Sequence, residues 1–104
     1  MISSDRINTV FEILSRIPKG KVSTYKQIAV YSHIKNPRIV GKILHKNTDP
    51  LKYPCHRVVK SDGSIASGYA FGGKNAQTKK LEYEGVEIKK GKINLKKFLF
   101  IYPR

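Results

Sequence analysis

The sequence holds a single cysteine, Cys55, set between Pro54 and His56. A thiolate is a strong nucleophile, and a neighbouring histidine or positive charge raises the fraction of thiol that is ionised. Pro54 fixes its own φ angle, and Val58–Val59 suit a buried strand. Cys55 is therefore expected where a turned segment enters a strand, a placement that would hold a nucleophile rigidly.

The same residues also fit a structural role for Cys55. A lone cysteine before two valines is typical of a small, buried, apolar side chain. On an extended backbone, adjacent side chains point to opposite faces, so Cys55 and His56 meet only if the chain turns or a water bridges them. Residue types alone leave both interpretations open.

Composition narrows the class of protein. A chain of 104 residues is predicted to form one domain, 1–104, and its 21 Lys+Arg against 7 Asp+Glu give a formal charge of +14. Such an excess attracts polyanions: nucleic acid first, an anionic membrane surface second. No apolar run approaches the roughly 20 residues of a spanning helix, and no signal-peptide pattern opens the chain. One cysteine cannot form an internal disulfide, and no ligand cluster suggests a metal, so we expect neither metal nor cofactor and a reducing compartment.

Three helices are predicted in the first half of the chain. Apolar residues recur at helical spacing from Ile7 to Ile17, behind possible N-cap oxygens in Ser3–Asp5. A second helix starts at Thr24, with Gln27 placed for a capping box. Asn36 and Pro37 open a third, over residues 38–46. The last two helices form a candidate helix-turn-helix.

The second half adds a hairpin and a further helix. Asp62–Gly63 between apolar residues predicts a β-hairpin over 58–65. The next helix is expected to be capped by Asn75 and closed by Gly85. Residues 89–104 alternate lysines with apolar residues, which indicates a basic amphipathic end segment. The fold class is therefore mainly α with a small β-hairpin, a winged helix-turn-helix in a single domain.

The segment Pro54-Cys55-His56-Arg57-Val58-Val59 resembles the active-site signature of the O6-alkylguanine-DNA alkyltransferases, repair proteins that move an alkyl group from guanine to a cysteine. Residues 22–29, 36–41, 68–73 and 84–85 resemble further segments of that family. The resemblance covers residues 6–88, while residues 89–104 match no part of the pattern we can interpret. From the resemblance we therefore expect a protein without the N-terminal domain that most members carry.

The resemblance implies roles for individual residues. Cys55 would be the nucleophile, His56 its base through a water, Glu84 the carboxylate that orients the histidine, and Tyr69 a hydrogen-bond donor to the leaving oxygen. The implied DNA contacts are Tyr25, Arg38, Gly41 and Lys42. Support of the active site would come from Asn47, Pro54 and Arg57, and the substrate pocket would be lined by Val58, Gly68, Tyr69 and Ala70.

Two positions depart from the family pattern. Ile39 stands where many members have alanine, although an apolar wedge can also help to separate base steps. Ala70 stands where some members have serine, so one side-chain hydrogen bond to the base would be absent.

The resemblance implies a single-turnover methylated-DNA–protein-cysteine methyltransferase that flips O6-alkylguanine out of double-stranded DNA and enters the minor groove. It would act as a monomer, away from membranes, in the cytoplasm at the nucleoid or in a nucleus. One alternative is an alkyltransferase-like protein that binds the lesion without transfer, although such relatives generally lack the cysteine. Others are a winged-helix regulator, which would need no Cys55, and a cysteine hydrolase, for which the +14 charge has no purpose.

Overall fold

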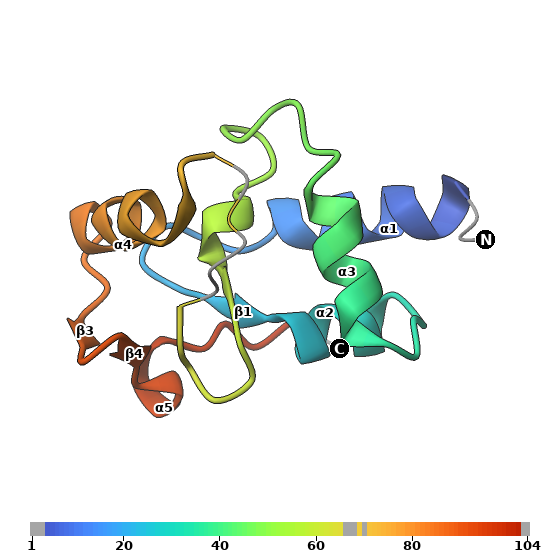
Figure 1. The fold of residues 1–104 in the computed structure, drawn as a ribbon. Coiled ribbons are helices and arrows are strands. Elements are labelled where there is room, and N and C mark those ends of the chain that lie inside the picture. The colour runs from blue at the N-terminus through green and yellow to red at the C-terminus, as the bar shows by residue number, and fades with distance from the viewer. Residues whose placement is uncertain (1–3, 66–68, 70, 103–104) are drawn as a thin grey trace.

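The computed structural model describes residues 4–65, 69 and 71–102 (Figure 1). Its elements in chain order are α1 (Ser4–Ser15), β1 (Ser23–Thr24), α2 (Tyr25–Tyr31), α3 (Pro37–Leu44), the 3-10 turn η1 (Cys55–Arg57), β2 (Val58–Val59), α4 (Gly73–Tyr83), β3 (Ile88–Lys89), β4 (Lys92–Ile93) and α5 (Leu95–Phe98). The described residues form a mainly helical domain with a small antiparallel hairpin, β3–β4, which agrees with the predicted fold class, although this hairpin lies elsewhere in the chain than the predicted one.

The predicted helix pair forms with the predicted caps. Thr24 Oγ1 accepts a hydrogen bond from the amide of Gln27 at 3.0 Å, and Asn36 Oδ1 accepts one from the amide of Arg38 at 3.0 Å. The side chain of Gln27 does not close the capping box, because its Nε2 donates to the carbonyl of Phe100 at 2.8 Å. This bond ties the C-terminal segment to the start of α2.

The prediction of a β-hairpin over 58–65 is wrong, because Val58–Val59 pairs with a strand from an earlier part of the chain. β2 instead runs parallel to β1, with Ser23 opposite Val58. The Asp62–Gly63 turn does form, since the amide of Gly63 donates to the carbonyl of Lys60 at 2.8 Å. A turn signal is local, whereas the partner of β2 is chosen by residues far away along the chain.

The chain that returns from this turn pairs with the C-terminal hairpin β3–β4. The amide of Ile65 donates to Gly91 at 3.1 Å, and that of Ile93 donates to Gly63 at 2.9 Å. Gly63 has φ +88°, and a Cβ there would lie 2.4 Å from the carbonyl oxygen of Ile93. Only glycine therefore allows the two segments to approach this closely.

Helix α4 begins earlier than predicted. Its N-cap is Gly72, with φ +118°, and Asn75 lies inside the first turn. A Cβ at Gly72 would lie 2.7 Å from the Cβ of Ala76, so the left-handed glycine replaces the expected polar cap. The predicted closure is correct: Gly85 has φ +91° directly after the C-cap, Glu84.

Strand β2 separates two hydrophobic clusters. Val58 packs into the cluster built by α1, α2 and α3, while Val59 packs into the cluster with Leu81 of α4 and the C-terminal hairpin. Both valines are completely buried. Because neighbouring strand residues face opposite sides, this short strand joins the two cores.

The basic C-terminal segment packs along the domain. The amide of Phe100 donates to the carbonyl of Val22 at 2.8 Å, and the Tyr102 hydroxyl donates to the carbonyl of Ile13 at 3.2 Å. The segment therefore crosses from the second cluster to α1. Among the helices of residues 4–102 that the structure describes, none has the length and apolar character needed to cross a bilayer.

Candidate active site and DNA interface

Cys55 is the first residue of η1 and is only 4% exposed. Its amide donates to the carbonyl of Tyr53 at 2.8 Å. Asn47 Nδ2 donates to the same carbonyl at 2.8 Å and to Cys55 Sγ at 3.3 Å. Burial raises the pKa of the thiol, and the hydrogen bond from Asn47 opposes that rise in part. A nearby base is therefore needed to generate the thiolate.

The next residue, His56, supplies a basic group in the same turn. Its Nε2 lies 3.1 Å from Oε2 of Glu84 at the end of α4. Burial lowers the pKa of His56, although Glu84 acts in the opposite direction, so the imidazole is neutral at pH 7. Its Nδ1 is buried and has no hydrogen-bond partner among the described residues. A neutral imidazole with a free nitrogen can accept a proton.

Arg57 holds Glu84 in place through two parallel hydrogen bonds. Nε donates to Oε1 at 2.9 Å and Nη2 to Oε2 at 2.6 Å, while Nη1 donates to the carbonyl of Ile17 at 2.7 Å. Burial raises the pKa of Glu84, but the hydrogen bonds from Arg57 and His56 bring it below its usual value. The ionised carboxylate thus links α4, the turn η1 and the segment after α1.

Gln77 is a site-supporting residue that the sequence analysis missed. Its Nε2 donates to the carbonyls of His56 and Val58, both at 2.9 Å, and its side chain is almost completely buried. It lies four residues before Leu81 on the buried side of α4, and this spacing is the signal that could have identified it. Most buried side-chain amides have hydrogen-bond partners; here Nε2 has two, whereas Oε1 has none among the described residues.

Tyr69 and Lys80 form a second contact beside this site. The Tyr69 side chain is buried in the same cluster as Cys55, and its hydroxyl accepts a hydrogen bond from Lys80 Nζ at 2.6 Å. Sequence reasoning did not single out Lys80. Gly68 and Ala70, expected in the substrate pocket, lie outside the described residues, whereas Val58 is buried in β2.

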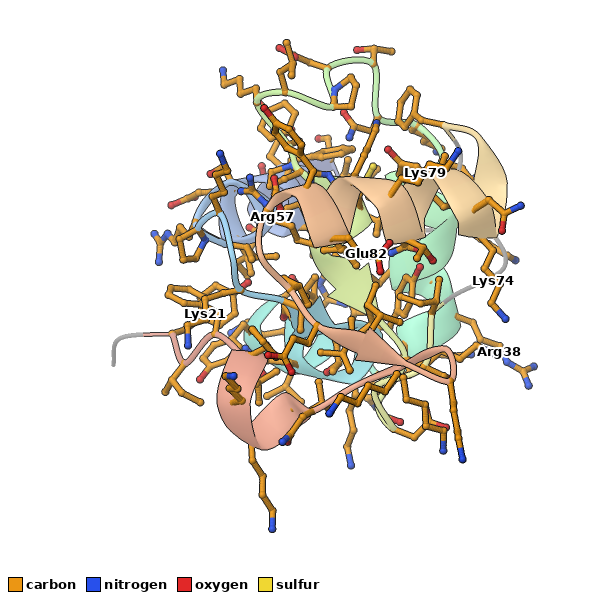
Figure 2. The ribbon with its side chains drawn as sticks, turned by 90° about the vertical axis from the view of Figure 1, so that its left-hand side faces the viewer. Lys21, Arg38, Arg57, Lys74, Lys79 and Glu82 are labelled. Carbon is orange, nitrogen blue, oxygen red and sulfur yellow. The ribbon has the colours of Figure 1, made fainter. Side chains whose placement is uncertain are left out.

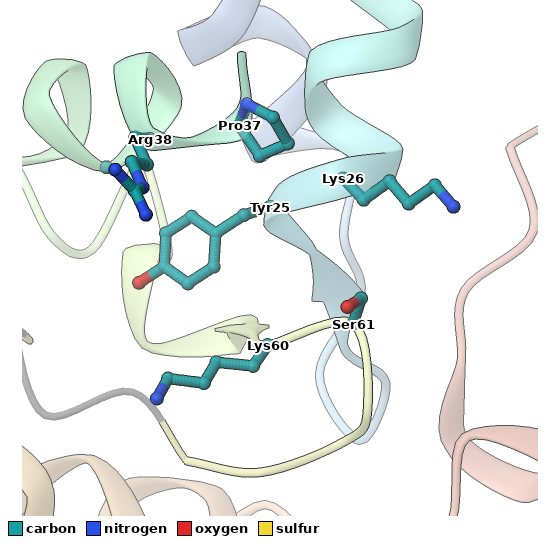
Figure 3. A pocket seen from close by; sticks show the side chains of 7 residues that line it. Tyr25, Lys26, Pro37, Arg38, Lys60 and Ser61 are labelled. Carbon is teal, nitrogen blue, oxygen red and sulfur yellow. The ribbon is translucent and has the colours of Figure 1, made fainter.

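A cavity of about 480 Å³ lies between the helix pair and the turn after β2 (Figure 3). Its lining residues are Tyr25, Lys26, Pro37, Arg38, Gly41, Lys60 and Ser61. In Figure 3 the Tyr25 ring lies between Arg38 on one side and Lys60 on the other. The structure therefore brings together three of the four expected DNA-contacting residues. The fourth, Lys42, lies near the end of α3.

The two groups of residues are neighbours, because the Tyr25 ring packs against the hydrophobic cluster that contains Cys55. Burial raises the pKa of the Tyr25 hydroxyl, and the Cys55 thiolate raises it further. A second cavity, of about 360 Å³, borders the site on the side of α4 and is lined by Pro50, Leu51, His56, Lys79, Lys80, Tyr83 and Glu84. The described residues contain no group of three or more side chains able to hold a metal ion.

A family model described as "6-O-methylguanine DNA methyltransferase, DNA binding domain" matches residues 6–86. The chain is 49% identical over 80 residues to a methylated-DNA–protein-cysteine methyltransferase of Saccharolobus islandicus, a match over 77% of this chain and 50% of the relative. It is 37% identical over 101 residues to a bifunctional methyltransferase/endonuclease of Picrophilus torridus, over 96% of this chain and 33% of that protein. The chain thus spans a third to about half the length of these curated relatives.

Solved structures give a complementary result. S. pombe Atl1, in complex with damaged DNA containing O6-carboxymethylguanine, superposes with a TM-score of 0.83 at 34% identity, over 98% of this chain and 100% of that chain. Mycobacterium tuberculosis OGT in complex with DNA superposes with a TM-score of 0.71 at 28% identity, over 81% and 51%. The C-terminal segment, for which the sequence analysis found no counterpart, therefore has one in S. pombe Atl1.

Proposed function

The chain belongs to the 6-O-methylguanine DNA methyltransferase family, and we propose that it repairs O6-alkylguanine in duplex DNA by transferring the alkyl group to Cys55. The arrangement of Asn47, Cys55, His56 and Glu84 is the observation that carries this proposal. It combines a positioned thiol, a neutral imidazole and an ionised carboxylate. Because a thioether is stable, each protein molecule would act once.

DNA binding begins with the positive charge of the protein, which attracts the phosphates. The small Gly41 would allow α3 to approach the minor groove, and a Cβ there would already contact Tyr25 at 3.9 Å. Extruding the damaged nucleotide costs a few kcal/mol, less when alkylation has weakened the base pair. Arg38 would fill the vacated space, and Tyr25 would contact the rotated phosphate.

Chemistry then takes place at the sulfur. His56 would accept the thiol proton through a water at its buried Nδ1, which has no partner among the described residues. The thiolate sulfur would bond to the alkyl carbon as the bond from that carbon to O6 breaks, leaving the electron pair on guanine. A hydrogen bond from the Tyr69 hydroxyl would stabilise the charge that develops on O6.

A second candidate function is binding of the lesion without transfer. The observation that favours it is the end-to-end superposition on S. pombe Atl1, compared with 81% of this chain on the M. tuberculosis OGT. Cys55 is the argument against it, because a protein that only binds needs neither a held thiol nor a base beside it. The two functions share the DNA interface and differ only at the sulfur.

One variant, tested on two substrates, separates base flipping from alkyl transfer. Arg38→Ala should slow transfer from O6-methylguanine in duplex DNA by about tenfold or more, because filling the gap offsets part of the flipping cost. The same variant should transfer the benzyl group of free O6-benzylguanine at nearly the normal rate, since no base is flipped. Equal losses on both substrates would show that Arg38 only supports the fold.

The matched control for Arg38→Ala is the same change at another arginine. Arg16→Ala removes an exposed arginine paired with Glu12 on α1 and should leave both rates unchanged. Cys55→Ser should abolish transfer while keeping the affinity for damaged duplex. Wild-type protein that binds the damaged duplex tightly but transfers no alkyl group would establish the second function instead.

A further inference from the structure

Lys80 lies on α4, and its ammonium group faces the candidate active site. Nζ donates to the Tyr69 hydroxyl at 2.6 Å and lies 5.1 Å from the centre of the Tyr69 ring and 6.0 Å from that of Phe71. It also lines the cavity of about 360 Å³ together with His56 and Glu84. These contacts fix a long side chain that would otherwise sample many rotamers.

We propose that Lys80 is a positioning residue for alkyl transfer: its ammonium group orients the Tyr69 hydroxyl toward the reacting base and keeps positive charge beside the Cys55 sulfur. This inference rests on the proposed function. No step requires a cofactor or an additional reactant.

The direction of the Lys80–Tyr69 hydrogen bond follows from chemistry. A lysine ammonium has three donors and no acceptor, so the Tyr69 oxygen must accept. The hydroxyl proton of Tyr69 is then left for another acceptor, and none of the hydrogen bonds among the described residues takes it. A hydroxyl that accepts from a cation also becomes a stronger donor, because linked hydrogen bonds polarise one another. Tyr69 is thereby prepared to donate to O6 of a bound guanine.

The charge of Lys80 acts on the nucleophile as well. Burial raises the pKa of Cys55; the hydrogen bond from Asn47 and the charge of Lys80 both oppose this rise. Burial likewise lowers the pKa of His56, and Lys80 adds to that effect, which keeps the imidazole neutral. As the S–C bond forms and the C–O6 bond breaks, the hydrogen bond from Tyr69 stabilises the electron pair on guanine until guanine takes a proton from water.

A double-mutant cycle tests whether Lys80 acts through Tyr69. With free O6-benzylguanine as substrate, Lys80→Met should slow single-turnover transfer by about tenfold, the effect of losing one charge-assisted hydrogen bond. In a Tyr69→Phe background the same change should slow transfer by less than about threefold, since the hydroxyl is already gone and only the effect of the lysine charge on the Cys55 thiol remains. Lys80→Arg, which keeps a cationic donor, should restore most of the rate.

Lys74→Met is the matched control, because it removes another exposed lysine from the first turn of the same helix. It should not alter the rate with the free base. Equal slowing by Lys80→Met in the wild-type and Tyr69→Phe backgrounds, or slowing by Lys74→Met as large as that by Lys80→Met, would overturn the proposal.

A second readout does not depend on alkyl transfer from guanine. The rate at which iodoacetamide alkylates Cys55 should rise with pH, and the midpoint should lie at higher pH in Lys80→Met than in the wild type. If the wild type reacts with iodoacetamide in this way but not with O6-benzylguanine, the proposed function fails while the influence of Lys80 on the thiol stands. Identical pH profiles for wild type and Lys80→Met would contradict the role of Lys80 itself.

Discussion

At the scale of single residues, the site depends on one carboxylate with two partners. Glu84 accepts two hydrogen bonds from Arg57 and contacts His56 through the same oxygen, Oε2, at 3.1 Å. Only 10% of its side chain is exposed, so little water is available to replace these partners. The carboxylate therefore contributes both to the fold and to the orientation of the imidazole.

Replacement of this carboxylate should be costly. Glu84→Gln leaves the largely buried guanidinium of Arg57 without its counter-ion, so the free energy of unfolding should fall by about 3 kcal/mol. Urea denaturation followed by circular dichroism measures the change. Glu87→Gln is the matched control: Glu87 forms an ion pair with Lys97 in which both side chains are about 60% exposed, and its loss should cost at most about 0.5 kcal/mol. Equal losses would contradict a structural role for Glu84.

The buried histidine makes stability depend on pH. Its pKa in the folded protein is lowered from 6.5 by burial, so the unfolded chain binds the proton more readily. Stability should therefore be complete above pH 6.5 and decline as the pH falls below that value. His56→Gln should flatten this decline between about pH 7 and 5. A wild-type free energy of unfolding that rises on acidification in this interval would show that the sign is wrong.

At the scale of elements, the turn after β2 is held by the C-terminal hairpin. Gly63→Ala places a Cβ 2.4 Å from the carbonyl of Ile93 and also strains a residue at φ +88°, so the free energy of unfolding should fall by about 3 kcal/mol or more. Gly91→Ala, at φ +74° with nothing within 4 Å, carries only the backbone strain and should cost about 1 kcal/mol. Chemical denaturation of both variants measures these losses. Similar losses would mean that the close approach of Gly63 to Ile93 is unimportant.

The elements also show what sequence could and could not predict. The helix caps Thr24 and Asn36 and the closing Gly85 were predictable, because each acts on neighbours within a few residues. The partner of β2 was not, since Ser23–Thr24 is distant in sequence and gives no local signal. The N-terminus of α4 was missed because Gly72 in a left-handed conformation replaces a polar cap.

The candidate site was predictable to a similar degree. Residue types singled out Cys55, and the family resemblance assigned roles to His56, Glu84 and Arg57. The structure places Cys55, His56 and Arg57 in one turn and joins Arg57 to Glu84 by two hydrogen bonds. Gln77 and Lys80 were missed, because their partners are backbone carbonyls and a tyrosine hydroxyl that only the folded chain brings close. The role of a polar residue in a helix can be recognised only when the buried face of that helix is known.

At the scale of the whole molecule, the positive charge is distributed over several faces. Figure 2 shows Arg38 and Lys74 projecting from one side and Lys21 lying on the opposite side. The cavity with Tyr25 and Lys60 belongs to the same region as Arg38. We infer that duplex DNA contacts the residues around this cavity, while lysines on the far side contribute mainly a long-range field.

Salt dependence distinguishes contacting lysines from distant ones. Lys42→Gln, on α3, should reduce the slope of log affinity against log salt concentration by about 0.9, the share of one phosphate contact on B-DNA. Lys21→Gln removes the same charge on the other side and should leave the slope nearly unchanged. Fluorescence anisotropy with an unmodified duplex gives both slopes, and equal reductions would contradict a localised interface.

Transfer to Cys55 is tested most directly by the intact mass of the protein after incubation with duplex DNA that contains O6-methylguanine. Each protein molecule should gain a single methyl group, peptide mapping should place it on Cys55, and repair should stop when the amount of repaired DNA equals the amount of protein. Turnover beyond one equivalent, a methyl group on another residue, or unmodified protein that still binds the damaged duplex would contradict transfer to Cys55.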